Sequence, residues 1–211
     1  MENGDNIFSR FEKHLLEDYK PSLYFNKIID NKIFTEYPLN LLRKLKYTEQ
    51  NKKYHPEGNV WNHTMLVIDE AAKRKNLSGD KTIFMWAALL HDIGKGATTK
   101  LRNGRLTSYD HDEAGESLTV QFLEYYTEDR DFINKVSKLT RWHMQPFFVN
   151  KDMKFADIST MKKDVSIDEI GLLSLCDRLG RGKMDNDKIN EEEKAIDTFL
   201  KKASIDDKIK V

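Results

Sequence analysis

The sequence predicts an all-α domain, and three observations support this prediction. Apolar residues recur at helical spacing in successive segments of the chain. Lys, Glu and Leu, which favour helices, are abundant. Proline and glycine, which interrupt helices, occur only 4 and 10 times in 211 residues. At this length we expect one domain, residues 1–211, with a sizeable hydrophobic core.

The expected helices follow the apolar periodicity and the residues that start and stop helices. In chain order they cover residues 7–19, 21–29, 39–45, 60–75, 80–92, 109–126, 131–143, 166–180 and 190–203. We expect residues 1–50 to form a helical cap without chemistry of its own. Residues 55–181 then form the core that carries the candidate site, and residues 182–211 contain a C-terminal helix.

Local signals mark the ends of several elements. Asp80 is predicted to cap the helix that follows it. Ser166, with Glu169 three residues later, has the spacing of a capping box. Between two helices, Asn103 and Gly104 favour a type I′ turn, which predicts a small hairpin over residues 101–106.

Composition excludes several classes of protein. The 35 basic and 35 acidic residues balance, so extended nucleic-acid binding, which depends on phosphate neutralisation, is not expected. The single cysteine, Cys176, excludes an internal disulfide and a cysteine-based zinc site. The chain has no long apolar segment that could span a membrane and no basic leader at its N-terminus. We therefore expect a cytoplasmic protein that does not enter membranes, and the sequence leaves its oligomeric state open.

An adjacent His91–Asp92 pair is the first sign of a metal site. The pair follows four apolar residues, 87–90, at the end of an expected helix, and Gly94 comes where that helix would stop. An imidazole nitrogen and a carboxylate oxygen together offer two ligands to a divalent metal. A buried aspartate after an apolar run is costly unless a cation neutralises it.

Further candidate ligands lie on other expected helices. His63 lies within an apolar helix, and Asp177 follows the apolar run 172–176. These two residues, with His91 and Asp92, suffice for one metal with open water positions. His111 and His143 are candidates for a second ion, bridged by Asp92, or for substrate binding. Nitrogen and oxygen ligands suit Mn, Fe, Co, Ni, Mg or Zn, and the sequence does not choose among them.

Four cations lie one to four residues from the candidate ligands and could bind a phosphoryl group. They are Lys95, Arg141, Arg178 and Arg181. The alternative for each is a solvated surface charge. His14 is expected to be structural, and His55, in a loop before Pro56, is not expected to be a ligand but could line the mouth of a pocket.

These residues and their neighbours resemble the HD-domain metal-dependent phosphohydrolase superfamily. The stretch from His55 through His63, and those around His91, His111, His143 and Asp177, are most similar to the HD domain of bacterial CCA-adding tRNA nucleotidyltransferases. The resemblance implies hydrolysis of nucleotide phosphoesters, including 2′-phosphates and 2′,3′-cyclic phosphates. The sequence shows no nucleotidyltransferase motif, so we do not expect the building of tRNA ends to carry over.

We therefore expect a metal-dependent phosphohydrolase that uses one or two divalent ions and acts on a nucleotide or related small phosphoester. Metal-activated water is the expected nucleophile, and Asp92 and Lys95 are the expected catalytic residues. Two alternatives stay open at this stage. One is a catalytically silent nucleotide-binding regulatory module, and the other is a di-iron oxygenase, an activity found in some HD proteins.

Overall fold

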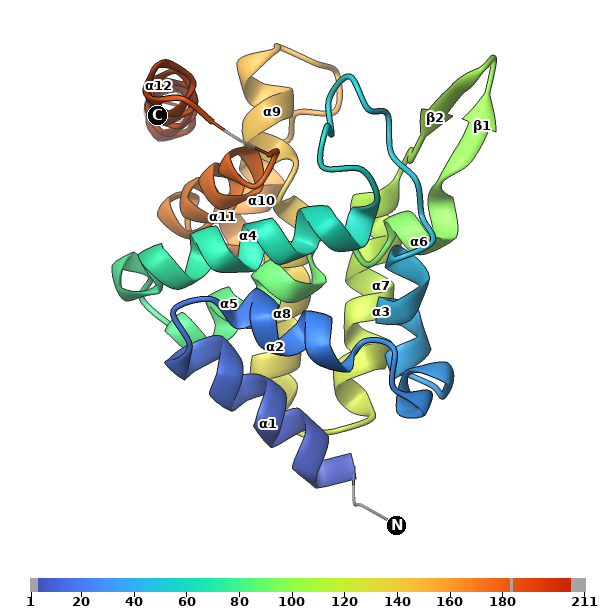
Figure 1. Ribbon diagram of the computed structural model, residues 1–211. Helices are drawn as coiled ribbons and strands as arrows, with labels where there is room; N and C mark the ends of the chain where they lie inside the picture. The colour runs from blue at the N-terminus through green and yellow to red at the C-terminus, as the bar shows by residue number, and fades with distance from the viewer. Residues whose placement is uncertain (1–3, 183, 206–211) are drawn as a thin grey trace.

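The computed structural model describes residues 4–182 and 184–205 and confirms the all-α fold with one small hairpin (Figure 1). The helices are α1 (Gly4–Glu17), α2 (Pro21–Ile28), α3 (Leu39–Leu45), α4 (Val60–Arg74), α5 (Lys81–Leu90), α6 (Lys95–Thr98), α7 (His111–Glu124), α8 (Arg130–Trp142), α9 (Gln145–Asn150), α10 (Ile158–Asp164), α11 (Ile167–Leu179) and α12 (Asn186–Ile205). Two short 3-10 helices, η1 (Lys32–Thr35) and η2 (Lys75–Leu77), and strands β1 (Lys100–Arg102) and β2 (Arg105–Thr107) complete the described elements.

Helix α5 forms the centre of the hydrophobic core. Every residue from Ile83 to Leu90 is buried, because the helix packs against α1, α4, α8 and α11 (Figure 1). A helix that is apolar all round is stable in water only when other elements cover it on every side. The end of α5 therefore delivers the residues that follow it, His91 and Asp92, into the interior of the domain.

The first fifty residues, expected to form a cap, share this core. Phe11 and Phe25 are fully buried and meet edge to face, with ring centroids 4.9 Å apart. Phe11 also lies 6.4 Å from the ring of Trp86 in α5. The N-terminal helices thus stabilise the helix that leads to His91 and Asp92.

The hairpin has the turn that its sequence predicts. Strands β1 and β2 pair antiparallel, with Arg102 opposite Arg105. Asn103 and Gly104 between them both have positive φ, as a type I′ turn requires. The short helices α6, α9 and α10 were not expected, because helices of four to seven residues are too short to show a reliable apolar period.

The predicted caps are confirmed in part. Asp80 accepts hydrogen bonds from the backbone N–H groups of Thr82 and Ile83, and Ser166 accepts one from Asp168. The prediction that Glu169 completes the capping box, by accepting a hydrogen bond from the backbone N–H of Ser166, is wrong. The Glu169 carboxylate instead accepts hydrogen bonds from Ser78 Oγ and the backbone N–H of Gly79, so that it ties α11 to the turn before α5.

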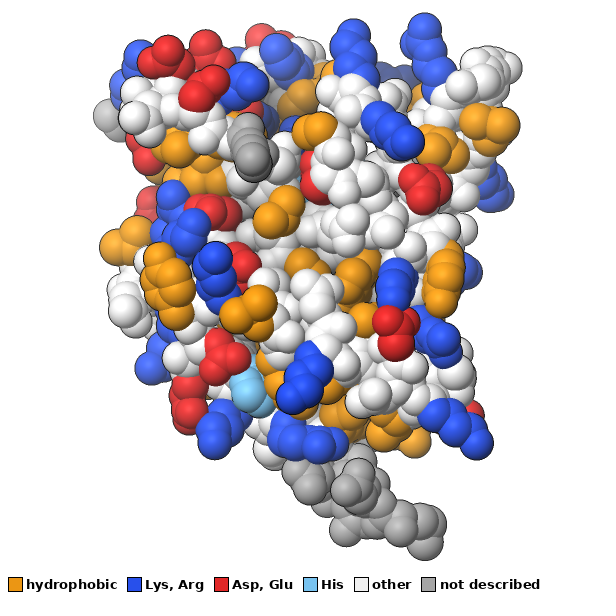
Figure 2. Space-filling view, in the orientation of Figure 1, with side chains coloured by type: hydrophobic (Ala, Val, Ile, Leu, Met, Phe, Trp, Pro, Cys, Tyr) orange, Lys and Arg blue, Asp and Glu red, His pale blue; other side chains and the backbone are white. Residues whose placement is uncertain are grey.

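The C-terminal segment is helical over Asn186–Ile205, while residues 183 and 206–211 of the expected segment 182–211 lie outside the described residues. Among the helices that the structure describes, none is both long and apolar enough to cross a membrane. Figure 2 shows basic, acidic and apolar side chains interspersed over one face of the molecule, as the balanced composition leads us to expect.

Candidate metal centre

Five helices bring the candidate ligands into one buried cluster. His63 lies in α4, Asp177 lies in α11, and His111 is the first residue of α7. The other three lie just beyond helix ends, with His91 and Asp92 after α5 and His143 after α8. All six side chains are buried, from fully covered for His63 and His91 to 9% exposed for His111.

Two glycines let these segments approach closely. A Cβ atom at Gly94 would lie 2.0 Å from the carbonyl oxygen of His111, so only glycine allows the turn after α5 to meet the start of α7. The expected role of Gly94 as a helix stop is wrong, because α5 ends at Leu90 and Gly94 has ordinary helical φ. At Gly180 a Cβ atom would lie 2.5 Å from Val67 Cγ2, which explains the close contact of α11 with α4.

Asp92 lies at the centre of the cluster, with different histidines at its two oxygens. Its Oδ2 atom is 3.6 Å from His63 Nε2 and 3.3 Å from His91 Nε2. Its Oδ1 atom is 3.5 Å from His111 Nε2 and 3.7 Å from His143 Nε2. Asp177 joins the first group, because its Oδ1 atom is 3.0 Å from His63 Nε2. The side chain of Asp92 is therefore placed to bridge two positions.

All four histidines present Nε2 to the cluster because their Nδ1 atoms bind elsewhere. His91, His111 and His143 donate from Nδ1 to the backbone carbonyl three residues earlier, at 2.8, 2.8 and 2.6 Å. His63 Nδ1 lies 3.3 Å from the carbonyl of Gly180 and 3.0 Å from Glu57 Oε1. Such bonds fix the tautomer that leaves the Nε2 lone pair free for a metal.

The cluster contains buried polar atoms that lack a hydrogen bond within the described structure. They are Nε2 of His63, Nε2 of His91 and both carboxylate oxygens of Asp92. The Nε2 atoms of His111 and His143 face each other at 3.3 Å, although both are lone-pair atoms when Nδ1 carries the proton. Ion-pair contacts reach two of these atoms, because Lys95 Nζ lies 2.7 Å from Asp92 Oδ2 and Asp177 Oδ1 lies 3.0 Å from His63 Nε2. Buried polar atoms that keep no partner, such as Asp92 Oδ1, are costly. Ligands about 2.1 Å from a divalent ion lie roughly 3 Å apart, so a metal at each position fits this donor set.

The electrostatics differ between the two groups. Burial by itself would lower the pKa of His63, but the close carboxylates of Asp177 and Glu57 raise it above its ordinary value. Burial and the charge of His111 lower the pKa of His143 to about 4. Burial would raise the pKa of Asp92, but Lys95 and His91 hold it well below its ordinary value. The carboxylate is therefore charged and available as a ligand.

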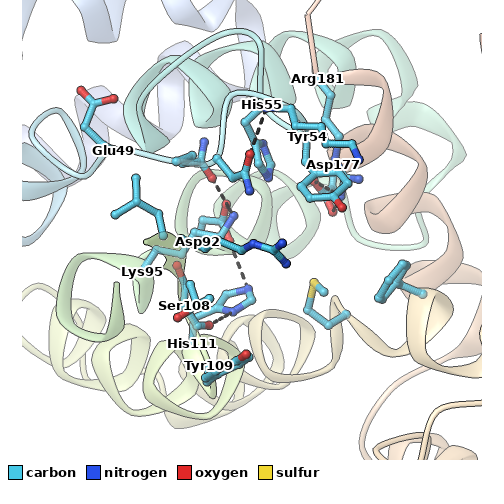
Figure 3. A pocket seen from close by; sticks show the side chains of 18 of the residues that line it. Glu49, Tyr54, His55, Asp92, Lys95, Ser108, Tyr109, His111, Asp177 and Arg181 are labelled. Carbon is cyan, nitrogen blue, oxygen red and sulfur yellow. Dashed lines mark hydrogen bonds and ion pairs between the residues drawn. The ribbon is translucent and has the colours of Figure 1, made fainter. Parts of the chain in front are cut away.

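A cleft with a volume of about 690 Å³ reaches the cluster from the surface, and Asp92, His111, His143 and Asp177 line it. Figure 3 shows Asp92 and Lys95 between His55 and Arg181 on one side and His111 on the other. Lys95 Nζ is 2.7 Å from Asp92 Oδ2, and Arg181 is 3.2 Å from Asp177 Oδ2. Both cations therefore lie at the wall of the cleft beside candidate ligands.

The structure does not bring the other two predicted phosphate-binding residues to the cleft. Arg141 pairs with the buried Asp112 and the exposed Glu113 and stacks over the ring of Trp142. Arg178 forms an ion pair with Glu192 of α12. Both arginines are therefore held in ion pairs away from the cleft, and with side chains 19% and 11% exposed neither is a solvated surface charge.

The two remaining histidines have local partners. His14 stacks on Tyr24 and lies 2.8 Å from Asp18, as expected for a structural residue. His55 lines the cleft, and its Nδ1 atom is 2.8 Å from Glu57 Oε1. His55 thus lies at the pocket, where the sequence left its role open.

Sequence reasoning missed two side chains that support the cluster. Glu57 is buried, and its Oε1 atom contacts Nδ1 of both His55 and His63. Gln50 lies in the segment expected to have no chemistry, yet it lines the cleft and accepts a 2.9 Å hydrogen bond from Lys95. Neither residue follows a helical period, and only the position of Glu57 two residues after His55 offered a signal.

Comparisons with known proteins agree with this geometry. The Multifunctional CCA protein of Pasteurella multocida is 33% identical over 128 residues, which cover 58% of this chain and 29% of the relative. The Multifunctional CCA protein of Mannheimia succiniciproducens is 26% identical over 190 residues, covering 84% of this chain and 43% of the relative. The chain thus matches less than half the length of these relatives. The profile of the HD domain matches residues 60–182, more than half of the chain and the segment that holds all six clustered residues. The chain belongs to the HD domain family.

Proposed function

We propose that the protein is a metal-dependent phosphohydrolase that acts on a nucleotide or a related small phosphoester. The main observation that supports this proposal is the position of Asp92. Each of its carboxylate oxygens has two histidine nitrogens nearby, and the side chain lies beside Lys95 in an open cleft. His63, His91, Asp92 and Asp177 would hold one divalent ion. Asp92, His111 and His143 would hold a second. A bound divalent ion supplies Lewis acidity and lowers the pKa of a water molecule.

The side chains around the ligands have distinct parts in this chemistry. The Lys95 ammonium can bind a phosphoryl oxygen while it holds the Asp92 carboxylate in place, and Gln50 keeps the ammonium at the cleft wall. Arg181 contacts Asp177 in the same way and presents a second cation to the cleft. Glu57 fixes the ring of His63, so it positions a ligand rather than touching the substrate.

A panel of phosphate esters tests this proposal. The purified protein, supplied in turn with each candidate divalent metal, should release phosphate or nucleoside from at least one nucleotide, and a chelator should stop the release. Lys95→Ala should lose at least about a hundredfold in rate while it keeps most of the metal, because it removes a phosphoryl contact but no ligand. Lys135→Ala is the matched control, because Lys135 forms an exposed ion pair and is not among the residues that line the cleft.

The regulatory-module alternative predicts a different result. If no phosphoester is hydrolysed with any metal while nucleotides still bind, the hydrolase proposal is wrong. Redox-active bound iron together with a silent panel would instead favour the oxygenase alternative.

A further inference from the structure

The cleft consists of two chemically different parts. Its floor contains the charged cluster around Asp92. Its mouth lies between two segments that both line it, the loop residues 49–55 before α4 and residues 105–109, which comprise strand β2 and the start of the loop after it. A volume of about 690 Å³ is in the range of pockets that hold ligands much larger than a phosphate group. The mouth therefore has room for the rest of the substrate.

Aromatic side chains face this mouth from both segments. Tyr54 is 58% exposed and Tyr109 is 63% exposed, and both line the cleft. Figure 3 shows Tyr54 on the side of Asp177 and Arg181 and Tyr109 on the side of Ser108 and His111. Single exposed tyrosines are ordinary on a protein surface. Two on opposite sides of one cleft offer a pair of flat surfaces to a ligand.

Cations stack over both rings. The Arg102 guanidinium lies 5.0 Å from the centroid of the Tyr109 ring, and Lys53 Nζ lies 5.6 Å from that of Tyr54. Such contacts restrict the ring positions and leave ring surface exposed. Leu106, Met144 and Phe147, all partly exposed, add apolar surface to the same cleft.

Several polar side chains of the two segments already bind protein groups. The hydrogen bonds are Lys95 Nζ to Gln50 Oε1 at 2.9 Å, the Lys53 N–H to Asn51 Oδ1 at 3.0 Å, Arg102 to Thr107 Oγ1 at 2.5 Å, and Thr99 Oγ1 with Ser108 Oγ at 2.7 Å. The charged side chains of Glu49, Lys53 and Arg105 also line the cleft and are exposed, so a ligand at the mouth meets both charged groups and aromatic rings. The two rings are the exposed groups that offer flat apolar surfaces.

We infer that the mouth of the cleft binds a nucleobase, which stacks on Tyr109 and Tyr54 while the phosphate reaches the floor. This inference rests on the proposed function and deepens it, since it selects nucleotides over other small phosphoesters. Stacking tolerates different bases, because every base has an aromatic face. Specificity for a particular base is therefore expected to be weak.

Binding of three phosphonates by calorimetry tests the inference without turnover. Phosphonate analogues of adenosine monophosphate, ribose phosphate and hexyl phosphate differ in what lies beyond the phosphorus, and their C–P bond resists hydrolysis. Two nucleoside phosphonates are prepared, one with the phosphonate at the 3′ position and one with it at the 5′ position. The one that binds more tightly is compared with the ribose phosphonate that has its phosphonate at the same position. The purified protein with its own metal should bind the nucleoside phosphonate at least about tenfold more tightly than the ribose phosphonate or the hexylphosphonate.

Variants assign the effect to the two rings. Tyr109→Ala and Tyr54→Ala should each weaken nucleoside phosphonate binding about tenfold and leave ribose phosphonate binding unchanged. Tyr109→Phe should keep wild-type affinity because it keeps the ring. Tyr125→Ala is the matched control, since Tyr125 is 58% exposed but lies against Tyr37 outside the cleft.

Three outcomes would overturn the inference. One is equal affinity for the nucleoside and ribose compounds, and another is hexylphosphonate binding as tight as that of the nucleoside. The third is an equal loss for nucleoside and ribose compounds in the alanine variants. Failure of hydrolysis with the base preference intact would refute the hydrolase and keep the base site, so the two proposals can fail separately.

Discussion

The two groups of candidate ligands on either side of Asp92 differ in the number of carboxylates that they contain. On the Oδ2 side, His63 contacts Asp177 at 3.0 Å, and Glu57 lies behind its ring. On the Oδ1 side, His111 and His143 face each other, and Asp92 supplies the carboxylate. A second carboxylate increases the attraction for a divalent cation. We therefore expect the Oδ2 position to bind the first metal tightly and the Oδ1 position to bind a second more weakly.

The largest expected effect comes from the residue that the two groups share. Asp92→Ala should remove metal from both positions and lower any hydrolysis at least about a thousandfold, because neither group keeps a complete set of ligands. Metal content by mass spectrometry and the rate on the best ester measure this. Asp131→Ala, with its carboxylate in an exposed ion pair, is the control. Full metal content in Asp92→Ala would refute the shared bridge.

A smaller effect should follow from damage to one side. His143→Ala should abolish binding of the second metal and keep the first, and turnover should fall about a hundredfold. His63→Ala should instead weaken binding of the first metal. Titration of metal-free protein, followed by calorimetry, gives the stoichiometry of each variant. If His111→Ala and His143→Ala both keep wild-type rate and stoichiometry, these histidines are structural and the centre holds one ion.

The pH dependence of metal binding should also separate the two sides. The raised pKa of His63 means that its ring keeps a proton up to a higher pH than an ordinary histidine in the metal-free protein, and below that pKa a metal must displace the proton. The affinity of the Oδ2 position for the first metal should therefore rise by up to about tenfold per pH unit until the pH passes the pKa of His63. His143, with a pKa of about 4, has already lost the corresponding proton at neutral pH. The affinity for the second metal should therefore depend little on protonation of His143. Binding isotherms measured at several pH values give the pH dependence of both metal affinities.

Helical geometry explains which residues around the centre the sequence could place. Neighbours along a helix point about 100° apart, whereas residues three or four apart share a face. Arg181 is four residues after Asp177 and lies beside it, and Lys95 is three residues after Asp92 and contacts it. Arg178 is next to Asp177 in sequence, and it points to α12 instead. Nearness in sequence to a ligand was therefore the wrong criterion for this arginine.

The loops required the structure, because no period constrains them. The all-α class, the hairpin and the caps at Asp80 and Ser166 follow from local signals, whereas contacts with the turn before α5 override the local signal at Glu169. Glu57, Gln50 and Tyr54 lie in the irregular segment between α3 and α4, whose path depends on contacts with distant residues. The ligands lie on or next to helices with apolar neighbours, and that is why their clustering could be anticipated.

The smallest expected effect tests whether the centre depends on helix capping or on packing. The Asp80 side chain caps α5 by accepting hydrogen bonds from the backbone N–H groups of Thr82 and Ile83. Asp80→Ala removes this cap and should lower the free energy of unfolding by about 1 kcal/mol. Asp80→Asn should keep most of this stability, since asparagine caps equally well. Metal content should stay at the wild-type value in both variants, because His91 and Asp92 at the other end of α5 are held by packing around Gly94. Denaturant unfolding with a metal assay measures both quantities. A loss of metal in Asp80→Ala at wild-type stability would show that the cap, and not packing, sets the position of the ligands.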